Sequence, residues 1–295
     1  MIINFLKYRK TYYVFSGILI VASLIFVLIF GLKLGIDFTG GSIMELVFDN
    51  QLPSNETIKE NLADLGLGEI IIQPTSGNGV ILRLGHVDEP THREILKRLE
   101  GAKEQSFEAI GPTIGKELTR KTKTAIILAL LAIASYVAFA FRRVSHPAKP
   151  WQYGLATLVS LFHDIIIPLG AFAILGKFYN VEINISFIAA MLTILGFSVH
   201  DTIVVFDRIR ENLLKRTSVS FEESINQGLN QTLVRSVNTV LTVLLTLFAL
   251  YFFGGESLKY FALTLIIGII SGTYSSIFIA SPLIFSWVNL RRKGY

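Results

Sequence analysis

The sequence predicts an α-helical polytopic membrane protein: six transmembrane helices, with an α+β domain inserted between the first two. Three observations predict this class. The 295-residue chain is 52% hydrophobic and 17% charged, with a mean hydropathy of +0.56, which is too apolar for an ordinary soluble domain. Six stretches approach or exceed the length of about 20 apolar residues that a helix needs to cross a bilayer. Between the first two stretches, residues 33–123 are polar and alternate between strand and helix periodicity.

The six stretches divide into two kinds by their charge. Four contain no Lys, Arg, Asp or Glu, namely residues 12–32, 124–141, 236–255 and 260–290. The other two contain one acid each: residues 151–176 carry Asp164, and residues 183–206 carry Asp201. The predicted divisions are therefore residues 1–32 (N-terminus and first span), 33–123 (inserted domain) and 124–295 (the other five spans and their loops).

Positive residues cluster at alternate ends of the spans and predict the orientation of the chain. They are Lys7, Arg9 and Lys10; Arg142, Arg143 and Lys149; Arg208, Arg210, Lys215 and Arg216; and Arg291, Arg292 and Lys293. The short loops at the opposite ends contain only Lys177 and Lys259. By the positive-inside rule, both termini are expected in the cytoplasm and residues 33–123 outside it. This distribution accounts for the net charge of +5 without a nucleic-acid partner. The first span is expected to remain as an uncleaved anchor, because residues 31–34 lack a small-residue cleavage site.

The inserted domain has the element order of a ferredoxin-like fold, strand–helix–strand–strand–helix–strand. The strands are expected at residues 42–48, 69–73, 80–84 and 105–110, and the helices at 53–65 and 89–99. Ser54 or Asn55 can cap the first helix.

The motifs of several enzyme classes do not occur in this sequence. There is no phosphate-binding Gly-x-x-x-x-Gly-Lys-Ser/Thr run, no nucleophile elbow and no metal-ligand spacing. The chain has no cysteine, which excludes disulfides and thiolate metal sites. We therefore expect no enzymatic activity, catalytic residue, metal site or cofactor.

The intramembrane acids are the strongest candidates for function. An aspartate in mid-span costs about 2.5–3.5 kcal/mol on insertion scales and usually has a partner facing it. Counted from the outer ends of their spans at 1.5 Å per residue, Asp201 and Arg235 both lie roughly 27 Å deep and Asp164 about 20 Å deep. The functional interpretation makes Asp201 a protonatable carrier and Arg235 the cation that balances it. The alternatives are a static buried pair, an Arg235 that only extends toward the cytoplasm, and an Asp164 that serves structurally near Pro168.

Two histidines and a stripe of small residues are weaker candidates. His163 and His200 each precede an acid, and imidazole exchanges protons near physiological pH, but adjacent helical residues point about 100° apart and need not touch. Gly268, Gly272 and Ser276 recur every four residues beside Ser271 and Ser275. This stripe predicts close helix packing, against either this chain or a partner.

Several segments resemble the SecD/SecF family of protein-export membrane proteins. Residues 35–42 (GIDFTGGS), with Gly35, Asp37, Phe38, Gly40 and Gly41, resemble the signature that opens the family's external domain. Residues 111–118 (GPTIGKEL) resemble the segment leading into the second span, and His163-Asp164 matches the third-span pair. Residues 196–212 (GFSVHDTIVVFDRIREN) resemble the fourth-span motif of the SecF branch, although His200 stands where the family pattern has Asn. Residues 231–236 and 253–255 are similar to the two ends of the fifth span.

The resemblance implies an RND-type half-transporter of the inner (plasma) membrane. Such a protein pairs with SecD, associates with the SecYEG channel and uses the proton gradient to help draw exported, unfolded polypeptides outward; the implied partners extend to YajC and YidC. Two rival functions remain open. One is half of an RND-like exporter of small molecules or ions, which requires a substrate cavity between external subdomains. The other is a non-transporting membrane scaffold, which tolerates neutral residues in place of the intramembrane acids.

Overall fold

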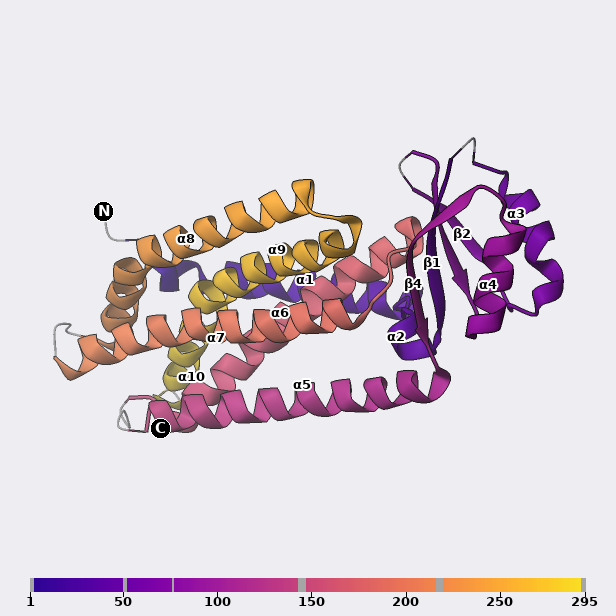
Figure 1. Ribbon diagram of the computed structural model, residues 1–295. Coiled ribbons are helices and arrows are strands. Elements are labelled where there is room, and N and C mark those ends of the chain that lie inside the picture. Colours follow the sequence, from indigo (N-terminus) through magenta and orange to yellow (C-terminus); the bar gives the residue numbers. More distant parts are fainter. Residues whose placement is uncertain (1–2, 50–51, 76, 143–146, 216–219, 293–295) are drawn as a thin grey trace. The chain divides into compact units, whose positions relative to one another are not determined.

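The computed structural model describes the chain except for residues 1–2, 50–51, 76, 143–146, 216–219 and 293–295 (Figure 1). Arg143, Arg216 and Lys293, which contribute to the charge asymmetry of the sequence, lie outside the described residues. The chain forms two compact units, one of Met1–Lys33 with Ala125–Tyr295 and one of Leu34–Thr124. The inserted domain expected at 33–123 differs from the second unit by one residue at each end.

Six helical segments within the described residues are long and apolar enough to cross a membrane, as predicted. They comprise α1 (Arg9–Phe30, preceded by the short helix η1, Phe5–Tyr8), α5 (Pro112–Ala140), α6 (Pro150–Tyr179), α7 (Ile185–Leu214) and α8 (Phe221–Phe253), followed by a composite sixth segment. The sixth consists of α9 (Glu256–Ser275), a π-helical turn η3 (Ser276–Ala280) and α10 (Ser281–Arg292). The sequence predicted this segment as one long span, and the π-helical turn within it was not anticipated.

The membrane helices approach one another closely at glycine residues. α6, α7 and α9 pack against one another, α1 lies against α6, and α8 lies against α7 and α9 (Figure 1). A Cβ on Gly170 would overlap Ser23 of α1, and one on Gly228 would overlap Ile209 of α7. Both glycines therefore allow backbone approaches that any larger residue would block.

The second unit contains a four-stranded antiparallel sheet in the order β2-β3-β1-β4. Its strands are β1 (Gly41–Phe48), β2 (Ile71–Pro74), β3 (Gly79–Leu84) and β4 (Ala102–Ile110), with α3 (Asn55–Leu62) and α4 (Glu89–Arg98) between them. This is the ferredoxin-like arrangement that the element order predicted. Ser54 caps α3 by accepting a hydrogen bond from the Thr57 N–H, which decides between the two expected caps.

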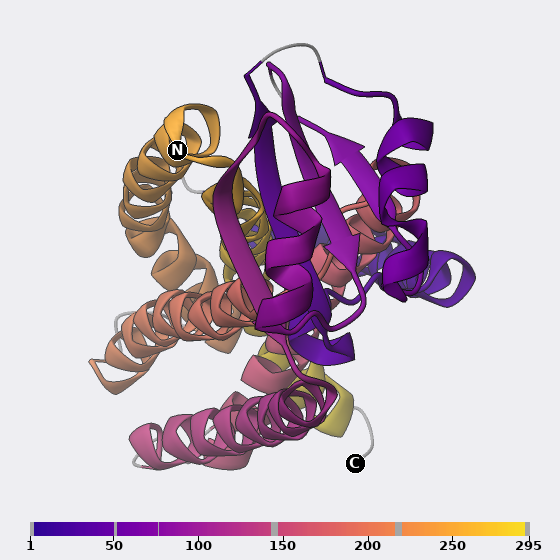
Figure 2. The same ribbon diagram turned by 45° about the vertical axis from the view of Figure 1, so that its right-hand side comes forward.

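The sheet buries one face beneath its two helices (Figures 1 and 2). Alternate residues of β1 and β3 point into this core, as the two-residue period of a strand requires. With the helices they form the cluster Met44, Leu46, Phe48, Ile58, Leu62, Val80, Leu82, Leu84 and Ile95. A register shift between Glu45 and Leu46 leaves Gln105 as an extra residue on the edge strand β4. Such a bulge limits further strand pairing at an exposed edge.

Candidate functional site

Asp201 lies on α7 inside the helical bundle and is held by two hydroxyl groups. Its side chain is 8% exposed. The Ser236 hydroxyl group on α8 donates a hydrogen bond to Asp201 Oδ1 over 2.6 Å. Ser276 is the first residue of η3, and its hydroxyl group donates to Asp201 Oδ2. Three helical segments therefore meet at this carboxyl group.

The expected ion pair between Arg235 and Asp201 is not formed within the described structure, which corrects the sequence-based pairing. Arg235 is exposed, and the residue that reaches Asp201 is its neighbour Ser236. The physical reason is helical geometry: consecutive side chains diverge by about 100°, so Ser236 and Arg235 cannot both reach the same carboxyl group on α7. The two residues do lie at neighbouring depths, because Ser236 directly follows Arg235.

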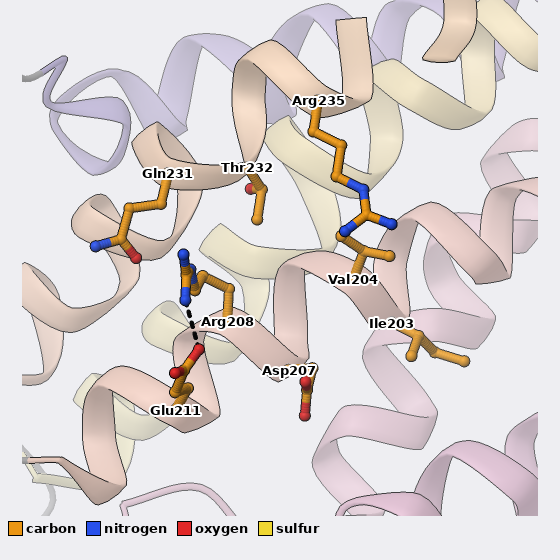
Figure 3. Close-up of a pocket in the computed structure, with 8 residues that line it drawn as sticks. All are labelled: Ile203, Val204, Asp207, Arg208, Glu211, Gln231, Thr232 and Arg235. Carbon is orange, nitrogen blue, oxygen red and sulfur yellow. Dashed lines mark hydrogen bonds and ion pairs between the residues drawn. The ribbon is translucent and has the colours of Figure 1, made fainter. Parts of the chain in front are cut away.

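Arg235 instead lines a cavity of about 380 Å³ between α7 and α8. The lining residues are Ile203, Val204, Asp207, Arg208, Glu211, Gln231, Thr232 and Arg235. Figure 3 shows the Arg235 side chain directed from α8 toward Val204 of α7, while Arg208 pairs with Glu211. The guanidinium of Arg235 therefore borders an open, polar space next to the helical turn that carries Asp201.

Asp164 lies on α6 in a second, completely buried site. Its Oδ2 accepts hydrogen bonds from Ser198 Oγ (2.6 Å) on α7 and Ser275 Oγ (2.8 Å) on α9. Its Oδ1 lies 3.2 Å from the donating Ser271 Oγ and 2.9 Å from His163 Nδ1. Four polar groups thus surround one carboxyl group, enough to satisfy both of its oxygens.

The two histidines occupy opposite environments. His163 is 1% exposed, its ring stacks on Tyr274, and its Nε2 has no hydrogen-bond partner among the described residues. His200 is exposed on the outside of α7 and does not line the Asp201 site. Of the two histidine–acid pairs in the sequence, only His163 and Asp164 are in contact in the described part of the chain.

The small residues of α9 pack against α7 of the same chain. A Cβ on Gly268 would overlap the side chain of Ile194, and one on Gly272 would lie 2.9 Å from Ser198 Cβ. The sequence left open whether this stripe packs against the same chain or a partner; at Gly268 and Gly272 the neighbour is α7 of the same chain. Ser276, the third residue of the stripe, differs from the glycines because its hydroxyl group binds Asp201.

The glycine-rich segment of the second unit folds around a helical turn that the sequence did not indicate, α2 (Ile36–Thr39). Gly35 precedes the turn and Gly40 ends it with φ = 75°, while Gly41 has φ = 137°. These positive values favour glycine. Asp37 and Phe38 lie within the turn and are half-buried.

This turn packs against the start of α5 by direct backbone contact. A Cβ on Gly40 would lie 3.0 Å from Pro112 Cα, and one on Gly115 would lie 3.0 Å from the Phe38 carbonyl oxygen. The two segments of the second unit that carry the family resemblance, residues 35–42 and 111–118, therefore lie against each other. Their glycines are explained by this close packing.

The serines around the two acids were not identified from the sequence as acid ligands. Ser160 precedes Asp164 by four residues, and Ser198 precedes Asp201 by three. Ser160 donates to Ser275 over 2.7 Å, and Ser198 binds the acid of the other helix. Helical spacing places each of these hydroxyl groups on the same face of its helix as an acid. Spacing does not show which acid each hydroxyl group binds.

Residues 91–290 match the family model "Protein export membrane protein SecD/SecF, C-terminal", and residues 25–51 match the "SecD/SecF GG Motif". The chain is 46% identical to the "Protein translocase subunit SecF" of Thermobaculum terrenum, with 97% of this chain and 94% of that protein covered. It is 36% identical to the protein of the same description from Rickettsia conorii, with 97% and 92% covered. It is also similar to the crystal structure of SecDF, a translocon-associated membrane protein from Thermus thermophilus, with a TM-score of 0.83 and 34% identity. That match covers 98% of this chain and 39% of the SecDF chain.

Proposed function

Because this chain belongs to the SecD/SecF family of protein-export membrane proteins, as a SecF-type translocase subunit, we propose that it couples proton movement to polypeptide export through Asp201. In this proposal Asp201 takes up a proton from one side of the membrane and releases it to the other. The free energy available is substantial, since one charge crossing the membrane potential yields about 2.3 kcal/mol per 100 mV.

The observation that carries the proposal is the pair of serine hydroxyls at Asp201. A hydroxyl group can donate to an ionised carboxylate and can accept from a protonated one. Ser236 and Ser276 can therefore bind Asp201 in both protonation states. An arginine cannot do this, because a guanidinium group only donates. A carboxyl group held by hydroxyls is suited to exchange a proton without losing its partners.

Protonation of Asp201 changes the direction of at least one of these hydrogen bonds. Ser236 belongs to α8 and Ser276 begins the π-helical turn η3, so the change acts on two different segments from one residue of α7. π-Helical turns occur frequently at functional sites. We place the conformational response at these contacts, from which it passes to the domain Leu34–Thr124 that contacts the emerging substrate.

Arg235 takes the role of a transient counter-charge in this proposal. It lies one residue from Ser236, at the cavity between α7 and α8. A rotation of α8 by about 100° would exchange Ser236 for Arg235 at Asp201. Such an exchange stabilises the ionised carboxylate in one state of the cycle and the hydroxyl-bound form in the other.

The partner that this proposal requires is a SecD-like chain. This chain spans 39% of the SecDF protein to which it is similar, which supports a separate subunit for the remainder. We propose the same membrane arrangement that the charges predicted: an inner (plasma) membrane location, both termini in the cytoplasm and the ferredoxin-like domain outside. SecYEG, YajC and YidC are proposed as further contacts, unfolded exported polypeptides as the substrate, and protons rather than a bound cofactor as the source of energy.

The test is export driven by a proton gradient in vesicles that contain the complex with Asp201→Asn. Asparagine keeps the size and hydrogen bonding of the side chain but does not titrate, so we expect assembly to persist and the gradient-dependent part of export to disappear. The control is Glu222→Gln, which neutralises an exposed acid in the first turn of α8, away from the cavity that Arg235 lines. Undiminished gradient-dependent export in Asp201→Asn rejects the carrier role and favours a scaffold.

A further inference from the structure

Two consecutive serines connect the two buried acids. Ser275 Oγ donates to Asp164 Oδ2 over 2.8 Å, while Ser276 Oγ donates to Asp201 Oδ2. All four residues are buried, and the acids belong to different helices, α6 and α7. Adjacent helical side chains point about 100° apart, which lets this pair of serines face two acids at once.

Each serine also has an alternative acceptor in its own helix. Ser276 Oγ lies 3.0 Å from the Thr273 carbonyl oxygen, and Ser275 Oγ lies 3.0 Å from the Gly272 carbonyl oxygen. A hydroxyl group has one proton to donate, so it serves either the carboxylate or the carbonyl. When Asp201 gains a proton at Oδ2, the acid becomes the donor to Ser276 Oγ, and the Ser276 proton turns to the Thr273 carbonyl.

The backbone at this point is able to respond to such a change. η3 begins at Ser276, and the Ser276 carbonyl oxygen accepts from Ser281 Oγ five residues later. A π-helical turn inserts one extra residue into a helix and so interrupts its regular i→i+4 hydrogen bonding at this point. A change at Ser276 therefore alters the helix at the residue that follows Ser275, the ligand of Asp164.

We infer that Ser275 and Ser276 act as a hydroxyl coupling between the two acids, so that protonation of Asp201 alters the hydrogen bonding of Asp164. The inference rests on the proposed proton exchange at Asp201 and makes both serines positioning residues. Ser160, which donates to Ser275, and Ser198, which donates to Asp164, complete the network on the Asp164 side.

Within the described residues, four charged or titratable side chains other than the two acids lie on or beside the residues of this network. His163 contacts Asp164 from α6, and Tyr274 of α9 stacks on His163. On the Asp201 side, α8 contributes Arg235 beside Ser236, and α7 contributes the exposed His200. Asp201 is therefore linked to Asp164 by the two serine side chains and the backbone between them, rather than by direct contact.

The test is infrared difference spectroscopy of the full-length chain, in lipid with its partner, over a range of pH. Asp164→Asn and Asp201→Asn assign the two carboxyl bands. In the unaltered protein we expect the Asp164 band to shift at the same pH at which Asp201 titrates. In Ser276→Ala the Asp201 band still titrates, with its midpoint moved by about one pH unit for the lost hydrogen bond, and the Asp164 band no longer follows it.

Three further variants separate coupling from a structural role. Ser275→Ala is expected to leave the Asp201 midpoint unchanged and to abolish the response of Asp164. Ser276→Thr keeps the hydroxyl group and restores the coupled shift. Ser286→Ala, which removes a hydroxyl bonded to Tyr13 elsewhere in the bundle, behaves like the unaltered protein.

The outcomes distinguish this inference from the proposed function. An Asp164 band that ignores the titration of Asp201 in the unaltered protein, or that still follows it in Ser276→Ala, overturns the coupling alone. An Asp201 band that does not titrate at all overturns the proposed proton exchange, and the coupling with it.

Discussion

Ser236 occupies the place beside Asp201 that charge balance would give to Arg235. Its hydroxyl group donates to Asp201 Oδ1 over 2.6 Å, while the preceding arginine is exposed at a cavity. The site around Asp201 is therefore lined by neutral hydroxyl groups, and within the described residues Asp201 forms no ion pair. Because Arg235 does not pair with Asp201 in this structure, a substitution of Arg235 can affect function without removing a contact that stabilises the fold.

Arg235→Gln is accordingly expected to reduce export without destabilising the protein. Removing one partner of a buried ion pair typically costs about 3–5 kcal/mol, whereas exposed substitutions usually change stability by less than about 0.5 kcal/mol. Denaturant unfolding of the purified protein distinguishes the two values. A loss of several kcal/mol would mean that Arg235 and Asp201 form a static pair.

Gly268→Ala tests the contact between α9 and α7. The added methyl group overlaps Ile194, so we expect a loss of about 1–3 kcal/mol in the free energy of unfolding. Gly196→Ala is the matched control, because its Cβ would meet no atom within 4 Å. Adding Ile194→Ala to Gly268→Ala makes room for the methyl group and should recover part of the lost stability. Equal stability of the two single variants would contradict this packing.

Gly40→Ala tests the backbone contact between the glycine-rich turn and the start of α5. Gly40 combines φ = 75° with contact to Pro112, so a side chain is strained both by conformation and by space. We expect a cost of about 1–3 kcal/mol from the backbone conformation alone. Gly111→Ala serves as the control, since its Cβ would meet no atom within 4 Å. Hydrogen exchange of the β1 and β4 amides reports the loss, and equal exchange in both variants would contradict it.

Asp88 caps α4, and its ionisation should make the stability of this helix depend on pH. Its side chain accepts a hydrogen bond from the Thr91 N–H over 3.1 Å, and bonding to Thr91 holds the pKa of this carboxyl group below its usual value. A lowered folded-state pKa contributes stability that is present above the unfolded-state pKa and is lost as the pH falls through the folded-state pKa.

The protection of the α4 amides in the full-length protein, that is, their exchange relative to the intrinsic rate at each pH, should therefore fall as the pH drops through the folded-state pKa of Asp88. Asp88→Asn retains a side-chain cap without the titration, so its exchange should lose this pH dependence. An identical acid response in both proteins would show that another group is responsible.

The sequence sufficed for the parts of this protein that depend on composition and periodicity. The six spans follow from the lengths of apolar runs, and the order of strands and helices in the second unit follows from hydrophobic spacing and from the cap expected at Ser54 or Asn55. Depth counting also placed Asp201 and Arg235 at neighbouring levels. Each of these features is local or repeats along the chain, so that a single sequence contains the signal.

The direction of individual side chains could not be obtained in the same way. A rotation of α8 by about 100°, the angle between consecutive residues, decides whether Ser236 or Arg235 faces Asp201. Helix orientations inferred from the spacing of apolar residues are not accurate to one residue. The π-helical turn that begins at Ser276 inserts one extra residue into an uninterrupted apolar run, which changes the direction of the side chains that follow. The division of Ser275 and Ser276 between two acids follows from the packing of α6, α7 and α9 together, which no single segment of the sequence records.

The most direct measurement is proton flux through the complex with its SecD-like partner in sealed vesicles, followed with an internal pH indicator under an imposed membrane potential. The unaltered protein and Glu222→Gln should both pass protons while a substrate is being exported. Asp201→Asn should reduce the flux to that of vesicles without the complex, because its side chain cannot carry a proton. Equal flux in Asp201→Asn and the unaltered protein would contradict the assignment of Asp201 as the proton carrier.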